Sequence, residues 1–379
     1  MIGLSVFLVR QIGGIVELRP KILLLLVVLA SSPGFSLASD GVPGRAAQNS
    51  GQDLSRAPLT MAQVVVWMEG GVESLRVAQL VKRQGIDFVP SNEFVDSLNA
   101  LHARGELLNA VKGAMVVRSG GDAAKEQAAY VSLLACEHDD IAGKQNDAKA
   151  ECSKAELLEP STAYFALGLL ARHTRNWDDA QRFFEAAAQS DPAIADNHNY
   201  LGVTFQQLRD FQNAETQYQD AIRLDPDYET PVNNLADLYL EQNDAAKAEQ
   251  FARQASALMP EDASAHWNLG LALFKQKRSS DGLKELREAE RLEPNASFRH
   301  EQIGDALVTM ERYEEALSEY RQASVSDANN PAIHLQILKM LVLLGRRDDA
   351  VSECETLKTL TPMDTKDSCK TVVAKLMRP

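Results

Sequence analysis

Six consecutive 34-residue blocks, from Ser161 to residue 364, carry the same residue types at the same places. We number these places 1 to 34 within each block and call them block positions. Block position 7 is Leu or Ile in every block, block position 20 is Ala or Gly in every block, and block position 32 is Pro in five of the six blocks. A fixed period of this length indicates an array of one repeated structural unit.

The pattern predicts a pair of antiparallel helices in each block. Small residues at block position 8 on the first helix and at block positions 20 and 27 on the second helix let the two helices approach closely. Large residues at block position 24 are expected to fill the flanks, and they are Phe184, Tyr218, Leu286 and Tyr320. The closing proline ends the second helix. Because one block cannot bury its own apolar face, the blocks are expected to stack.

This period and pattern resemble the tetratricopeptide repeat. The resemblance implies an all-α fold, a right-handed superhelical solenoid of antiparallel helix pairs. The expected repeats are 161–194, 195–228, 229–262, 263–296, 297–330 and 331–364. Residues 122–160 look like a degenerate first repeat, and residues 365–379 are expected to form a C-terminal capping helix.

The first 38 residues have the layout of a signal peptide. Lys21 precedes an apolar run from Ile22 to Ala30, and small residues end the segment at Ala38, after which we expect cleavage. The apolar run is shorter than the roughly 20 residues that span a membrane, which favours a cleaved signal peptide over a permanent span. An uncleaved membrane anchor is the alternative. Residues 39–58 read as a disordered linker. With this leader the chain resembles an exported bacterial member of the family.

Residues 59–118 show no 34-residue echo and are expected to form a small bundle of three or four helices. Ser91 is placed to cap its third helix. Its apolar residues are interpreted as a core rather than a ligand pocket, and no role is assigned to it.

The four cysteines fall into two pairs near the ends of the array. Cys136 and Cys152 occupy block positions 8 and 24 of the degenerate repeat, whereas Cys354 is at block position 24 of the last block and Cys369 lies on the final helix. We predict one disulfide in each pair, worth roughly 3 kcal/mol in the chain-entropy model. The alternative is four buried thiols.

Several function classes are disfavoured by composition and motifs. A formal net charge of −14 disfavours nucleic-acid binding. Phosphate-binding loops and hydrolase or metalloprotease motifs are absent, so we expect no enzymatic activity, no catalytic residue, no cofactor and no small-molecule substrate. Four histidines share block position 4, namely His198, His266, His300 and His334. Because they are one repeat apart they cannot share one metal ion, and a packing role is expected instead of a metal site.

The resemblance implies that block positions 2, 5, 9, 12 and 13 line a concave groove. The candidate partner-binding residues are Phe165, Leu169, Asn199, Asn233, Asp237, Trp267, Leu271, Phe274, Glu301 and Asp305. Apolar anchors beside carboxylates suit a peptide with apolar side chains and some positive charge. The alternative for Trp267 and Phe274 is that they pad neighbouring helices.

The chain is therefore expected to be a non-enzymatic scaffold of the cell envelope, periplasm or secreted space that binds a protein or peptide. The alternatives are a membrane-anchored assembly subunit and an accessory subunit of an envelope enzyme. Membrane contact is expected only if the leader is uncleaved.

Overall fold

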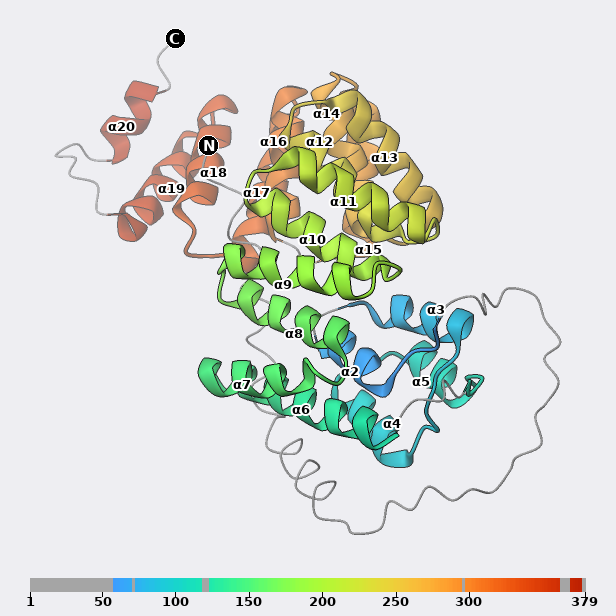
Figure 1. Cartoon of the computed structure of the whole chain (residues 1–379). Helices are drawn as coiled ribbons and strands as arrows, with labels where there is room; N and C mark the ends of the chain where they lie inside the picture. The colour runs from blue at the N-terminus through green and yellow to red at the C-terminus, as the bar shows by residue number, and fades with distance from the viewer. Residues whose placement is uncertain (1–56, 70–71, 118–122, 295–296, 362–368, 377–379) are drawn as a thin grey trace. The chain divides into compact units, whose positions relative to one another are not determined.

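The computed structural model describes residues 57–69, 72–117, 123–294, 297–361 and 369–376 (Figure 1). Within these ranges every extended regular element is an α-helix, which confirms the predicted all-α class. None of the described helices combines the length and apolar character that crossing a membrane requires. The predicted leader, nearly all of the predicted linker and the turn near residue 120 lie outside these ranges.

The described part of the segment before the repeats contains four helices: α2 (Met61–Glu69), α3 (Ser74–Gln84), α4 (Asn92–Ala100) and α5 (Gly105–Lys112). Ser91 caps α4 by accepting a hydrogen bond from the backbone N–H of Phe94. Leu59, Ile86 and Val116 also form two parallel backbone bridges, with Ile86 in the middle. These bridges tie the beginning, middle and end of the segment together and were not expected.

Among the residues that the structure describes, the repeats form seven helix pairs followed by one further helix. The helices are α6 (Ala123–Ile141), α7 (Gln145–Ala155), α8 (Pro160–His173), α9 (Trp177–Ser190), α10 (Ala195–Gln207), α11 (Phe211–Leu224), α12 (Glu229–Glu241), α13 (Ala245–Leu258), α14 (Ala263–Lys275), α15 (Ser279–Leu292), α16 (Ser297–Thr309), α17 (Tyr313–Ser326), α18 (Pro331–Leu343), α19 (Arg347–Leu360) and α20 (Cys369–Leu376). From α10 and α11 onward, equivalent helices begin 34 residues apart up to α18 and α19.

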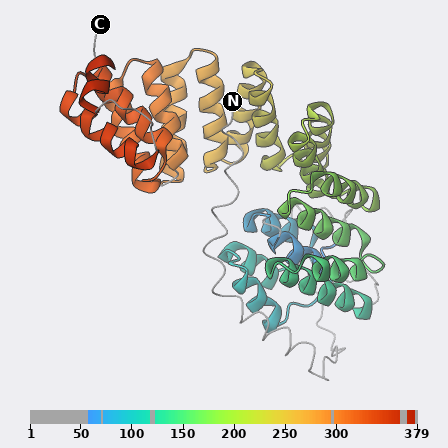
Figure 2. The same cartoon turned by 90° about the vertical axis from the view of Figure 1, so that its left-hand side faces the viewer.

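The chain divides into two compact units, one ending at Leu208 and the other beginning at Arg209. Unit 1 contains α2 to α10, and unit 2 contains α11 to α20. In unit 2 the helices from α12 to α19 follow one another side by side in antiparallel succession (Figure 2). The predicted superhelical course of the whole array stays a prediction.

Within several pairs a glycine on one helix lies close under a large side chain of the other. A Cβ atom on Gly168 would lie 2.6 Å from the ring of Phe184, and one on Gly304 would lie 2.7 Å from the ring of Tyr320. The large side chain at block position 24 therefore lies directly over block position 8, rather than on the flank of the pair as expected. In the third block both places are small, and Ala236 and Ala252 share one buried cluster.

The first helix of each of the six blocks is followed by a residue with positive φ at block position 15. These residues are Arg175, Arg209, Asn243, Lys277, Glu311 and Gly345, with φ between 57° and 71°. In the last block the N–H of Gly345 bonds to the carbonyl of Val342, and the N–H of Arg346 bonds to that of Leu341. This pair of bonds is the Schellman motif, which satisfies carbonyls at a helix end and reverses the chain.

The structure brings both predicted cysteine pairs to disulfide distance. Cys136 and Cys152 join α6 to α7 with their Cα atoms 5.1 Å apart, and Cys354 and Cys369 join α19 to α20 with theirs 5.7 Å apart. The first disulfide occupies the contact between block positions 8 and 24 that Gly168 and Phe184 make in the next pair. Each bridge fastens a terminal helix that has a repeat on one side only.

Candidate functional site

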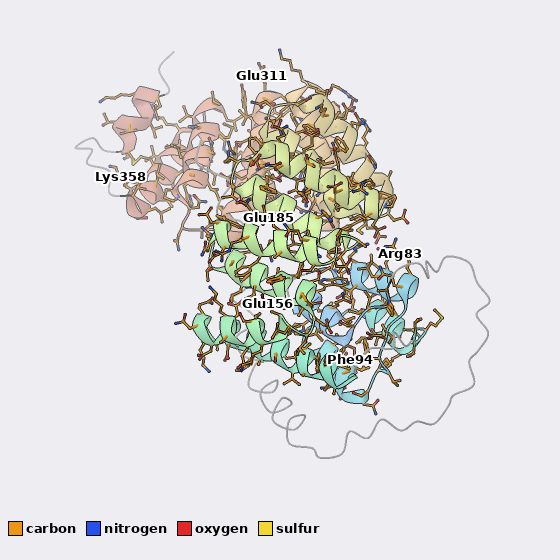
Figure 3. All side chains as sticks on the ribbon, in the orientation of Figure 1. Arg83, Phe94, Glu156, Glu185, Glu311 and Lys358 are labelled. Atoms are coloured by element: carbon orange, nitrogen blue, oxygen red, sulfur yellow. A yellow bond between two sulfur atoms is a disulfide. The ribbon has the colours of Figure 1, made fainter. Side chains whose placement is uncertain are left out.

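The helices before the repeats pack on the first helices of unit 1. Helix α2 contacts α6 and α8 (Figure 1), and the hydroxyl of Thr60 donates to Glu159 Oε2 at 3.0 Å. The ring of Phe94, labelled in Figure 3, lies 6.3 Å from that of Tyr130 on α6. We call this segment before the repeats the N-terminal module. The module packs on the surface of the repeats beside it, a contact that the sequence did not indicate.

A buried ion pair completes this attachment. Arg76 of α3 donates from Nη2 to Asp196 Oδ2 of α10 at 3.0 Å, and the two side chains are 7% and 1% exposed. Asp196 is at block position 2, one of the places expected to face a partner. In unit 1 this place binds a residue of the chain itself.

Three predicted groove residues of unit 1 are consequently buried. Phe165 and Leu169, on the helix that α2 contacts, are each 1% exposed, and Asn199 is 3% exposed. The ring of Phe165 packs 5.5 Å from Phe184 and 5.0 Å from Tyr200. Their expected place on an open surface is therefore corrected: they belong to the interior of unit 1.

In unit 2 the expected aromatic anchors also serve packing. Trp267 is 7% exposed, its ring meets Phe298 edge to face at 5.5 Å, and the guanidinium of Arg299 lies 5.8 Å from it. Phe274 packs on Gly282, where a Cβ would lie 2.7 Å from its ring. Trp267 thus joins two neighbouring repeats, which corrects its expected role as an exposed anchor, and Phe274 closes the pair α14 and α15.

Carboxylates remain at the surface of the first helices of unit 2. We call block positions 2, 5, 9, 12 and 13 on α12, α14, α16 and α18 the first-helix face. It carries two acidic pairs one helical turn apart, Asp237 with Glu241 on α12 and Glu301 with Asp305 on α16. Asn233 accepts from the amide of Asn268 at 2.9 Å, which joins α12 to α14.

The charges of the second acidic pair reinforce one another. Burial, together with the negative charges of Asp305 and Asp327, raises the pKa of Glu301. Asp305 is exposed and accepts a hydrogen bond from Tyr320 Oη at 2.6 Å. A cationic side chain bound here would relieve the repulsion between the two carboxylates.

Apolar side chains lie along the same face. Leu271 is half-buried on α14, and Leu335 of α18 is 42% exposed, with Val342 half-buried on the same helix. Leu271 lies on the helix between the two that carry the acidic pairs. Of the predicted groove residues, Asn233, Asp237, Leu271, Glu301 and Asp305 therefore keep surface on one face of unit 2.

Sequence comparison identifies the repeats. Two sequence profiles described as tetratricopeptide repeat match residues 165–229 and 205–269. No curated protein matches the chain significantly.

Solved structures resemble the same helical array. One chain in the structure of the APC/C hetero-tetramer Cut9–Hcn1 superposes with a TM-score of 0.52 at 15% identity, covering 76% of this chain and 55% of that one. PilF of Pseudomonas aeruginosa is 24% identical, with a TM-score of 0.48, over 60% of this chain and 98% of that one. MamA of Desulfovibrio magneticus RS-1 is 18% identical, with a TM-score of 0.41, over 44% of this chain and 95% of that one.

The 34-residue period, the helix pairs closed by a small residue under a large one, and the two profile matches agree. The chain belongs to the tetratricopeptide repeat proteins, a family of protein–protein interaction scaffolds.

Proposed function

We propose that the chain is a non-enzymatic scaffold that holds a basic, partly apolar segment of another protein on the first-helix face of unit 2. The observation that carries this proposal is the arrangement of two acidic pairs, on α12 and α16, with half-buried Leu271 on the helix between them. Lysines and arginines of a partner would pair with the carboxylates, while its apolar side chains would cover Leu271 and Leu335.

Unit 1 supports this choice of face by exclusion. Its first helices are contacted by α2 and α3, and its block positions 5 and 9 on α8 are buried. On the equivalent surface of unit 2 four carboxylates outnumber two lysines, Lys275 and Lys339, so the surface is acidic on balance. The net charge of −14 adds a long-range attraction for a basic segment.

A peptide titration tests the proposal. The probe is a fluorescein-labelled peptide of alternating Lys and Leu, followed by anisotropy, with an alternating Glu and Leu peptide as its charge-reversed counterpart. We expect the basic peptide to bind and the acidic peptide not to bind. Neutralising Glu301→Gln together with Asp305→Asn should weaken the binding about tenfold at low salt, with a smaller effect at high salt.

The matched control removes the same number of negative charges from a surface outside the first-helix face. Asp348 and Glu355 are exposed on α19, a second helix, so Asp348→Asn with Glu355→Gln removes two charges away from the face. If this control weakens binding as much as the Glu301 and Asp305 variant does, only net charge matters and the proposed face is wrong.

We further propose that the chain is exported to the periplasm or a secreted space. The signal-like leader and the two disulfides support export, because structural disulfides persist in oxidising compartments. N-terminal sequencing of protein from fractionated cells, with non-reducing peptide mapping, tests it. A chain beginning near Ser39 with both bridges is expected. An intact leader in the membrane fraction would favour the anchored assembly subunit, and co-purification with an enzyme would favour the accessory subunit.

A further inference from the structure

Three histidines at block position 4 each face a glutamate 19 residues later in the same block. The Nδ1 atoms of His266, His300 and His334 lie 2.7, 2.9 and 2.5 Å from carboxylate oxygens of Glu285, Glu319 and Glu353. In the fourth and sixth blocks the other ring nitrogen, Nε2, contacts a backbone carbonyl of the preceding block, that of Pro260 or Ala328. These two imidazoles join neighbouring blocks, which is a packing role.

The histidine of the fifth block has one further acidic neighbour, which comes from the fourth block. Glu290 of α15 brings a second carboxylate to His300, with its Oε1 3.0 Å from Nδ1. The equivalent residues beside His266 and His334 are Ser256 and Ser324. One ring nitrogen of His300 therefore faces two carboxylate oxygens, which come from α15 and α17.

Arg287 holds this cluster in place. Its guanidinium lies 2.8 Å from Oε2 of Glu290 and 2.5 Å from Oε1 of Glu319, so it engages the two oxygens that point away from His300. The side chains of Glu319, His300 and Glu290 are 9%, 16% and 21% exposed. The three converging atoms are thus oriented, partly shielded and still within reach of solvent.

We propose that Glu290, His300 and Glu319 bind a divalent transition-metal ion of the zinc type. Their ligand atoms all lie within 4.8 Å of one another. Tetrahedral coordination with bonds of roughly 2.0–2.1 Å needs ligand atoms about 3.4 Å apart, so the two distances from His300 Nδ1 to the carboxylate oxygens, 3.0 and 2.9 Å, have to open by only a few tenths of an ångström. A water molecule would be the fourth ligand.

The chemistry of the cluster favours a bound metal ion over a proton on His300. A proton on Nδ1 serves one of the two facing oxygens well, whereas an ion between them serves all three ligand atoms. The imidazole nitrogen selects Zn²⁺ over Mg²⁺ or Ca²⁺, which prefer oxygen ligands. Arg287 acts as the outer partner that fixes ligating carboxylates. The ion would clamp α15 of one repeat to α16 and α17 of the next.

Calorimetric titration of the full, disulfide-bonded chain with ZnCl2 after EDTA treatment tests the site. We expect one saturable equivalent of Zn²⁺ and a higher melting temperature, and neither effect with MgCl2 or CaCl2. Glu290→Ser installs the residue of the neighbouring blocks, so its fold is expected to survive, and it should weaken zinc binding at least about 100-fold. Glu285→Ser, at the fourth-block pair, is the control and should leave the titration unchanged.

Ser324→Glu is the converse test, because it should create a second zinc site in the next block. It gives His334 and Glu353 the second carboxylate that they lack, with Arg321 at the place that Arg287 holds in the fourth block. The zinc stoichiometry should rise from one to two. The proposal is overturned if the wild-type chain shows no saturable equivalent, if Glu290→Ser binds like the wild type, or if Ser324→Glu stays at one. None of these outcomes depends on the peptide face.

Discussion

Tyr320 Oη donates a hydrogen bond of 2.6 Å to Asp305 Oδ1, which connects the interior of the fifth repeat to its first-helix face. The tyrosine ring is 1% exposed, while the carboxylate is at the surface. Burial, then the hydrogen bond and charge of Asp305, raises the pKa of Tyr320 far above its usual value. The hydroxyl therefore stays a donor at any physiological pH and fixes the direction of the carboxylate.

Tyr320→Phe should lower the free energy of unfolding by about 1.5 kcal/mol, because it removes a hydrogen bond to a charged acceptor and keeps the ring. Affinity for the basic peptide should not fall, since the Asp305 carboxylate remains. Urea unfolding and peptide anisotropy measure the two effects. Tyr313→Phe is the control, because among the described residues Tyr313 is half-buried on the same helix without a side-chain hydrogen bond. Equal losses in the two variants would contradict the role given to the Asp305 bond.

Gly304→Ala should destabilise the chain by about 1 to 3 kcal/mol through overpacking, although alanine favours helices. The added Cβ would lie 2.7 Å from the ring of Tyr320, a buried side chain with little room to move. Gly105→Ala is the control, since nothing lies within 4 Å of the Cβ that it adds. Thermal unfolding should show a lower melting temperature for Gly304→Ala and an unchanged or higher one for Gly105→Ala. The reverse order would contradict the close contact.

The sequence predicted what repetition determines. Residues that recur every 34 places imply equivalent helices, and the small residues at block positions 8 and 20 imply a close pair. The same register placed Cys136 opposite Cys152, so the first disulfide followed from the repeat itself. Cys369 could be assigned because one cysteine and one further helix remained at that end of the array.

Features that no sequence signal marks escaped prediction. Phe165 and Leu169 match groove positions in sequence, but the contacts of α2 with the first helices of unit 1 come from a segment without a repeat. The positive φ at block position 15 was also missed, because Arg175 and Glu311 stand where glycine is usual and only Gly345 carries the signal. The glutamates that face the histidines lie 19 residues away, on another helix, where no local motif marks them.

Asp196→Ala should lower the free energy of unfolding by about 3 to 5 kcal/mol, because it leaves the guanidinium of Arg76 buried without that carboxylate. Arg76→Met combined with Asp196→Leu should recover most of this loss, since apolar side chains can replace a buried ion pair. Arg182→Ala breaks the exposed pair with Asp179 and should cost less than about 1 kcal/mol. Urea unfolding compares the three. A cost of Asp196→Ala no larger than that of Arg182→Ala would show that the pair does not hold the module.

His334→Gln should destabilise the chain more at about pH 5.5 than at about pH 9. Burial on its own would lower the pKa of His334, but the hydrogen bonds to Glu353 and to the carbonyl of Ala328, with the charge of Glu353, raise it above its usual value. Both ring nitrogens face acceptors, at 2.5 and 2.9 Å, so the folded state favours the doubly protonated ring.

A histidine whose pKa is higher in the folded state stabilises the fold fully below the unfolded pKa of about 6.5, and this contribution is lost as the pH rises through the folded pKa. The gap between wild type and His334→Gln should therefore be on the order of 1 kcal/mol in acid and shrink in alkali. Urea unfolding in EDTA across this range measures the gap free of metal effects. Glu353→Gln should remove most of the same pH-dependent increment, while the hydrogen bond to the carbonyl of Ala328 keeps the remainder. A gap that widens with rising pH would mean that the folded chain prefers the neutral ring, contrary to the two acceptors that surround it.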